Sequence, residues 1–243
     1  MCSLEQLSKY IDVLIPVTTL PLLDILLCSM ISNKSRWFQL HAVINLIIVS
    51  IIWKDVNNYY MYLFDAIKDK ESDLDNCFII VLHVYHCLFF TNLTRLDYFH
   101  HLLFVIMGVL PSLILIKTNI IKLLTFTGCG LPGLIEYTSL VLMKHDYLRV
   151  LQQKNINSYM YVYFRNPLAM FNLSFIYISY INGYLANESP YILLYVMTLT
   201  YFNATFYNKL AVENYRNTYY NLTFLYRGKK YDNYLINSNN EII

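Results

Sequence analysis

The chain has 243 residues, of which 57% are hydrophobic and only 14% are charged, and its mean hydropathy is +0.40. Because soluble domains carry about 25% charged residues, this composition excludes an ordinary soluble domain and indicates a membrane protein. The net charge is +2 at neutral pH, without a Lys/Arg stripe or a block of like charges. The charge distribution therefore argues against nucleic acid as a partner.

Seven apolar stretches are long enough to cross a bilayer as helices of about 20 residues. They are predicted over residues 10–32, 37–53, 76–94, 98–116, 123–143, 166–187 and 189–208. Strict alternation of polar and apolar residues is absent, and a backbone in lipid must satisfy its own hydrogen bonds, so we expect helices. The predicted fold class is all-α, a polytopic membrane protein with about seven transmembrane helices.

The distribution of basic residues predicts an orientation. The connections that follow the first, third and fifth stretches lie on the same side as the C-terminus, and this side carries twelve Lys and Arg residues. The other side carries six. The positive-inside rule then places the C-terminus in the cytosol and the N-terminus in the lumen or outside the cell. A polar, basic connection is predicted over residues 147–165. The first apolar stretch lacks a basic n-region and a cleavage site, so we expect it to remain as the first span.

Polar side chains inside the predicted spans are costly in lipid and are the first candidates for a site. His83 and His86 are three residues apart and share one face of a helix. Asp97 precedes His100 and His101 by about one helical turn, and a carboxylate beside an imidazole raises its basicity. Asp97, His100 and His101 are therefore the predicted catalytic group. The alternatives are an interfacial polar cap for this group and interhelical hydrogen bonding for His83 and His86.

A second polar feature is the segment GCGLPGLIEY, residues 128–137, in the fifth apolar stretch. Its glycines and Pro132 weaken the helix and permit close helix approach. Glu136 is predicted to point into the same cavity as the histidines, and the alternative is a packing kink with a buried, protonated carboxyl. His41, in the second apolar stretch, and Asp65, before the third, are further polar candidates. No metal is predicted, because no spacing of ligands indicates a zinc site, and the five cysteines lack a CxxC pair and are interpreted as core residues.

Taken in this order, these residues resemble the TLC-domain family, which includes ceramide synthases and the translocon-associated TRAM proteins. The resemblance rests on RWFQLHAVIN (residues 36–45), YLFDAI (62–67), DYFHH (97–101) and GLPGLIEY (130–137). It implies a six-helix TLC-like core over residues 34–208, after an N-terminal segment 1–33 with the first span and before a cytosolic tail 209–243. Ceramide synthases continue after the His pair with H-D-x-x-D and a Glu, whereas this chain continues LLFVIMGVLPSLILIKTN.

The resemblance implies a protein that binds or handles a lipid, a sphingoid base or an acyl chain, in an intramembrane cavity without a resident cofactor. The alternatives are an acyl-CoA-dependent N-acyltransferase with a His/Asp general base, for which acyl-CoA is the cosubstrate, and a seven-helix receptor or transporter. The expected partners are membrane lipids, with a homo-oligomer left open. The expected location is the endomembrane system, the endoplasmic reticulum rather than the plasma membrane.

Overall fold

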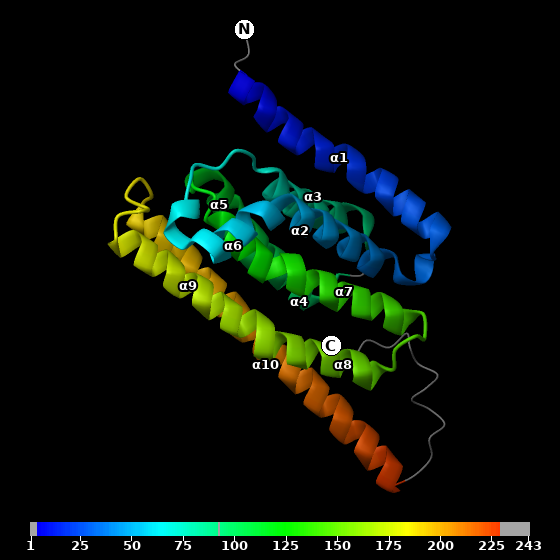
Figure 1. Cartoon of the computed structure of the whole chain (residues 1–243). Helices are drawn as coiled ribbons and strands as arrows, with labels where there is room; N and C mark the ends of the chain where they lie inside the picture. The colour runs from blue at the N-terminus through cyan, green and yellow to red at the C-terminus, as the bar shows by residue number, and fades with distance from the viewer. Residues whose placement is uncertain (1–3, 92, 229–243) are drawn as a thin grey trace.

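A computed structural model describes residues 4–91 and 93–228, and within these ranges consecutive helical segments join into seven rods (Figure 1). The rods are α1 (Leu4–Met30); η1, α2 and η2 (Asn33–Ser35, Arg36–Tyr62, Leu63–Ala66); α3 (Leu74–Phe89); α4, η3 and α5 (Arg95–His100, His101–Val109, Leu110–Leu115); α6, η4 and α7 (Ile121–Thr125, Phe126–Gly130, Leu131–Lys144); α8, η5 and α9 (Val150–Tyr159, Met160–Arg165, Asn166–Ile181); and α10 (Pro190–Gly228). Each predicted apolar stretch overlaps one rod, so the all-α prediction is confirmed.

Three of the described rods are long and apolar enough to cross a membrane, namely Leu7–Met30, Asn33–Ala66 and Arg95–Leu115. The apolar helix α3 is shorter. Large aliphatic side chains remain on the outer surface of these rods, and Leu22, Ile25 and Leu88 are 68%, 70% and 71% exposed. Contiguous apolar surface of this kind is rare on soluble proteins and is expected where lipid replaces water.

The connections from the second rod to the third, from the fourth to the fifth and from the sixth to the seventh lie at one end of the bundle, on the left in Figure 1. The backbone N–H of Lys70 donates to the carbonyl of Lys117 over 2.8 Å. The carboxylate of Glu188 accepts the backbone N–H groups of Lys117 and Thr118 over 2.9 and 2.7 Å. Three connections far apart in sequence are thereby joined, one pair by a main-chain hydrogen bond and the other through the side chain of Glu188.

The connection from the first rod to the second and that from the fifth to the sixth meet at the opposite end, on the right in Figure 1. Lys34 forms an ion pair with Asp146 at 3.4 Å, and the hydroxyl of Ser35 lies 2.9 Å from Nε2 of His145. Because these loops and the previous three lie at opposite ends, successive rods run antiparallel, as expected for a bundle with short connections.

Two carboxylates fasten α1 to the rest of the bundle. Asp24 accepts hydrogen bonds from Nε of Arg36 at 2.9 Å and from the hydroxyl of Tyr85 at 2.7 Å. Nearer the N-terminus, Asp12 accepts a hydrogen bond from the hydroxyl of Ser72 at 3.0 Å. Both carboxylates are buried, and buried charges persist in proteins when they are paired in this way. The two contacts fix both halves of α1, one against α2 and the second half of α3 and the other against the connection before α3.

The prediction of a polar connection over residues 147–165 is wrong for most of its length. Residues Val150 to Arg165 form α8 and η5, which continue into α9 without a break. The polar side chains of Gln153, Asn157 and Arg165 are buried against neighbouring helices. The high content of polar residues predicts a loop. In the folded protein these polar side chains are instead buried, because neighbouring helices supply their hydrogen-bond partners.

The predicted tail also begins as helix. α10 continues past residue 208 to Gly228 and is 39 residues long, which corresponds to about 58 Å at a rise of 1.5 Å per residue. In Figure 1 its C-terminal part extends beyond the other rods. Residues 229–243, which include part of the predicted cytosolic tail, lie outside the described residues.

Candidate functional site

Five of the six histidines converge where α2 and α3 meet the α4–η3 helix. Nε2 of His83 lies 3.2 Å from Nε2 of His100. The ring of His101 lies 5.2 Å from that of His83 and 5.1 Å from that of His86, between centroids. His41 stands 5.8 Å from His83. The structure thus brings together all the histidines that the sequence singled out.

Local sequence explains much of this convergence. His83 and His86 lie three residues apart, so one face of α3 carries both rings into the bundle. Trp37 holds the cluster from α2, stacked on His86 at 3.3 Å and edge-on to His41 at 3.6 Å between centroids. The aromatic ring of Tyr137 lies 4.3 Å from His41 on the other side.

Asp97 has a different role in the structure from the one predicted. Its Oδ2 accepts hydrogen bonds from the backbone N–H and the hydroxyl of Thr94, each over 2.8 Å, and these contacts form a capping box at the start of α4. An acidic side chain in the first turn points back toward the helix N-terminus, where unpaired N–H groups are found. His100 and His101 have other partners: the hydroxyl of Tyr207 lies 2.8 Å from Nδ1 of His100. The thiol of Cys87 lies 3.2 Å from Nδ1 of His101.

A cavity of about 120 Å³, which we term the apolar cavity, opens beside the histidines between α3, the α4–η3–α5 rod, the α6–η4 helix and α10. His83 and His100 form part of its wall, as does the side chain of Asn203. Most of the wall is aliphatic or aromatic, from Ile79, Phe104, Val105, Val109, Ile121, Leu124, Val196 and Leu199. Apolar walls with a few polar groups are typical of small-molecule sites.

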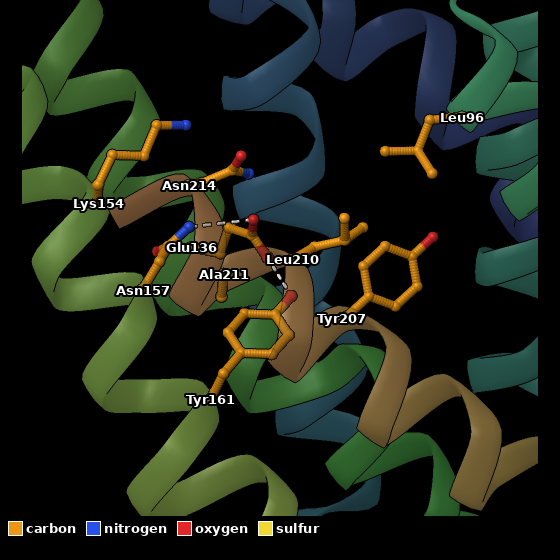
Figure 2. Close-up of a pocket in the computed structure, with 9 residues that line it drawn as sticks. All are labelled: Leu96, Glu136, Lys154, Asn157, Tyr161, Tyr207, Leu210, Ala211 and Asn214. Atoms are coloured by element: carbon orange, nitrogen blue, oxygen red, sulfur yellow. Dashed lines mark hydrogen bonds between the residues drawn. The ribbon is translucent and has the colours of Figure 1, made fainter. Parts of the chain in front are cut away.

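Glu136 lines a second cavity of about 130 Å³, which we term the polar cavity and which Figure 2 shows. Its carboxylate accepts hydrogen bonds from the amide of Asn157 at 3.1 Å and the hydroxyl of Tyr161 at 2.6 Å. The prediction that Glu136 shares the cavity of the histidines is therefore wrong. Each residue turns a helix by about 100°, so Tyr137 faces His41 while Glu136 faces α8.

Asp65 lies apart from both cavities. It belongs to η2, where it is exposed, at the end of the bundle that carries the Lys70–Lys117 contact. The histidines lie in the last two turns of α3, the first turns of the next rod and the first turns of α2, toward the opposite end. The prediction that Asp65 contributes to the lipid cavity is wrong, since Asp65 lines neither cavity and lies toward the other end of the bundle from His83.

Arg165 is the residue that sequence reasoning missed. Its Nη2 donates to the carbonyl of Gly128 at 2.8 Å and to Oδ1 of Asn203. Its guanidinium carbon lies 4.9 Å from the ring centre of Tyr161 and 5.8 Å from that of Tyr207. Gly128 and Asn203 line the apolar cavity, and the two tyrosines line the polar cavity. Arg165 therefore lies in the partition between the cavities. The sequence signal was an arginine directly before the apolar stretch 166–187.

No group of three or more His, Cys, Asp or Glu side chains among the described residues is arranged to hold a metal ion. Cys28, Cys77, Cys87 and Cys129 are free thiols. No protein-family model, no curated protein and no solved structure matches the chain.

Proposed function

We propose that the chain is a multi-pass membrane protein of TLC-like type that holds a lipid, a sphingoid base or an acyl chain, in the apolar cavity. The single observation that carries the proposal is this cavity, enclosed by four helical rods and lined mainly by apolar side chains. The imidazoles of His83 and His100 and the amide of Asn203 supply polar groups that can orient a ligand. Such a wall complements an amphipathic molecule better than a fully polar one.

The proposal includes seven membrane crossings, with α1 placed before a six-helix core. The three long apolar rods and the antiparallel order of the bundle support this topology. The lumenal N-terminus and cytosolic C-terminus rest on the distribution of Lys and Arg. The location in the endoplasmic reticulum rests on the resemblance of RWFQLHAVIN and DYFHH to TLC-domain proteins.

Cross-linking with a photoactivatable, clickable fatty acid or sphingosine tests whether the apolar cavity holds lipid. Gly108 lines this cavity, and a Cβ added there would lie 3.9 Å from Leu199. We expect Gly108→Phe to fill the cavity and to abolish cross-links to η3 and α10. Ile106→Phe is the matched control, because Ile106 is on the same helix with its side chain 55% exposed.

The wild-type protein should yield cross-linked peptides from η3 and α10, and Ile106→Phe should leave them in place. If Gly108→Phe labels as strongly as wild type at the same peptides, the lipid lies on the outer surface and the proposal fails. Thermal unfolding in detergent shows in parallel whether both variants are folded.

Acyl transfer is a second proposal, favoured by His100. This imidazole lines the cavity and contacts His83 through one nitrogen and Tyr207 through the other. An amine or hydroxyl that displaces His83 from Nε2 of His100 could pass its proton to this nitrogen as it attacks the thioester carbonyl of acyl-CoA, the cosubstrate, with the CoA thiolate as leaving group. Lipidomics on membranes that contain wild type, His100→Ala or His101→Ala tests this activity. Identical ceramide and phospholipid profiles in all three would refute it.

A further inference from the structure

Arg165 is a buried cation whose charge is not balanced by a carboxylate among the described residues. Its side chain is 3% exposed, and its Nη1 has no hydrogen-bond partner there. Its described partners are carbonyl or amide oxygens and two aromatic rings. Arg165 also lies near the middle of the α8–η5–α9 rod, which runs from Val150 to Ile181.

An arginine in this position has a physical cost. Taking a charge out of water is costly, and charged side chains buried inside a protein are usually paired with an opposite charge. The nearby carboxylate of Glu136 is already hydrogen-bonded to Asn157 and Tyr161 in the polar cavity. The ring of Tyr161 lies against the guanidinium, while its hydroxyl binds Glu136.

The wall of the apolar cavity also lacks a carboxylate, among the described residues, that could neutralise Arg165. This wall contains histidine, asparagine, serine and threonine side chains, and within the described residues it contains no Asp or Glu. Asn203 lines this cavity and accepts a hydrogen bond from Nη2 of Arg165. The guanidinium therefore lies directly behind the cavity wall, and an anion inside the cavity would meet a cation there.

We propose that Arg165 receives the anionic head group, a carboxylate or a phosphate monoester, of a single-chain lipid whose hydrocarbon chain occupies the apolar cavity. This inference rests on the proposed function and selects a ligand class within it. The head group displaces the Asn203 amide oxygen from Nη2 and reaches the unpaired Nη1. A guanidinium fork binds such an anion through two parallel hydrogen bonds, which are stronger than bonds to an amide.

Competition against the photoactivatable fatty acid tests the ligand class on the full-length protein in detergent. The competitors are palmitate, lysophosphatidate, hexadecanol and sphingosine, which share a single chain and differ in head-group charge. We expect palmitate or lysophosphatidate to compete about tenfold better than hexadecanol and sphingosine, since a charge-assisted hydrogen bond is worth about 1.5–3 kcal/mol. Whichever of these two anions competes more strongly shows whether the head group is a carboxylate or a phosphate monoester.

Three variants separate binding from folding. Arg165→Gln should abolish the preference for anions, and Arg165→Lys should retain part of it. Asn203→Asp places a carboxylate beside the guanidinium, so the cation is neutralised within the protein, and anionic lipids should lose their advantage while the fold is kept. Lys209→Gln is the control for removing a basic side chain, because Lys209 is exposed on α10.

Two outcomes overturn the inference. One is equal competition by hexadecanol, sphingosine and palmitate in the wild-type protein, and the other is an unchanged preference for anions in folded Asn203→Asp. In both cases the proposed function survives if Gly108→Phe still abolishes labelling. If Gly108→Phe has no effect on any lipid, the proposed function itself fails. Unfolding curves show whether a variant is folded. If Arg165→Gln does not fold, Asn203→Asp alone tests whether the preference for anions depends on the guanidinium.

Discussion

His100 and Tyr207 are 107 positions apart in the chain, and Nδ1 of the imidazole lies 2.8 Å from the phenolic oxygen. His100 lines the apolar cavity and Tyr207 lines the polar cavity. Their hydrogen bond therefore joins the walls of both cavities and holds α10 against the α4–η3 helix. Arg165 lies against the same tyrosine ring, 5.8 Å from its centre.

Tyr207→Phe removes this hydrogen bond and keeps the aromatic ring. We expect the free energy of unfolding to fall by about 1 kcal/mol, because a partly buried imidazole nitrogen loses its partner. Thermal unfolding in detergent measures the change. Tyr201→Phe is the matched control, since Tyr201 is also on α10 and is 53% exposed. Equal shifts for the two variants would show that the contact with His100 contributes nothing.

Gly133→Ala tests the close approach of α7 to α2. A Cβ at Gly133 would lie 2.6 Å from Nδ2 and 3.2 Å from Cγ of Asn45, which is buried. We expect a loss of about 1–3 kcal/mol in the free energy of unfolding, typical of overpacking. Gly128→Ala is the control, because a Cβ there meets nothing within 4 Å. It should leave the stability unchanged or raise it slightly, and a larger loss at Gly128 than at Gly133 would contradict the packing.

Arg36→Gln tests the attachment of α1. The substitution leaves the buried carboxylate of Asp24 with Tyr85 as its remaining strong donor. Since Arg36 itself is partly exposed, we expect a loss of about 2 kcal/mol rather than the larger cost of a fully buried pair.

Lys34→Gln is the comparison for Arg36→Gln, because the Lys34–Asp146 pair is exposed at both side chains, 46% and 86%. Exposed pairs contribute less than about 1 kcal/mol. Thermal unfolding of both variants, together with proteolysis at the connection between α1 and α2, measures the difference. A smaller effect at Arg36 than at Lys34 would refute the role of Asp24 as the anchor.

Glu71→Cys and Asp146→Cys test the seven-crossing topology in a chain whose native cysteines are replaced. Glu71 lies in the connection that contacts residues 117–118, and Asp146 pairs with Lys34 at the other end. In intact microsomes a membrane-impermeant maleimide should label Asp146→Cys, on the predicted cytosolic side, and spare Glu71→Cys. Labelling of both positions before the membrane is opened would exclude a membrane between them.

The helices and their order followed from local properties of the chain. Each apolar stretch of about 20 residues is long enough to form a helix on its own. The three-residue spacing of His83 and His86 then places both side chains on one face of that helix. The convergence of five histidines was predictable to that extent, because each lay on an apolar helix where polar groups are costly.

The partners of the polar groups did not follow from local spacing. Asp97 lies within reach of His100 by sequence, yet it caps its own helix through Thr94, because nearby N–H groups are available before any tertiary contact forms. Glu136 and Tyr137 are adjacent, yet they face different cavities, and only the packing of α7 against α2 and α8 determines which faces which.

The sequence by itself determined that this chain forms apolar helices, since the backbone hydrogen bonds and the aliphatic surface are set residue by residue. Only the tertiary structure decided that Arg165 is a buried cation between two cavities and not a charge in a loop. A polar segment becomes helical and buried when distant residues supply its hydrogen bonds, here Gly128 and Asn203. Those partners come from separate rods, and no local pattern brings them together.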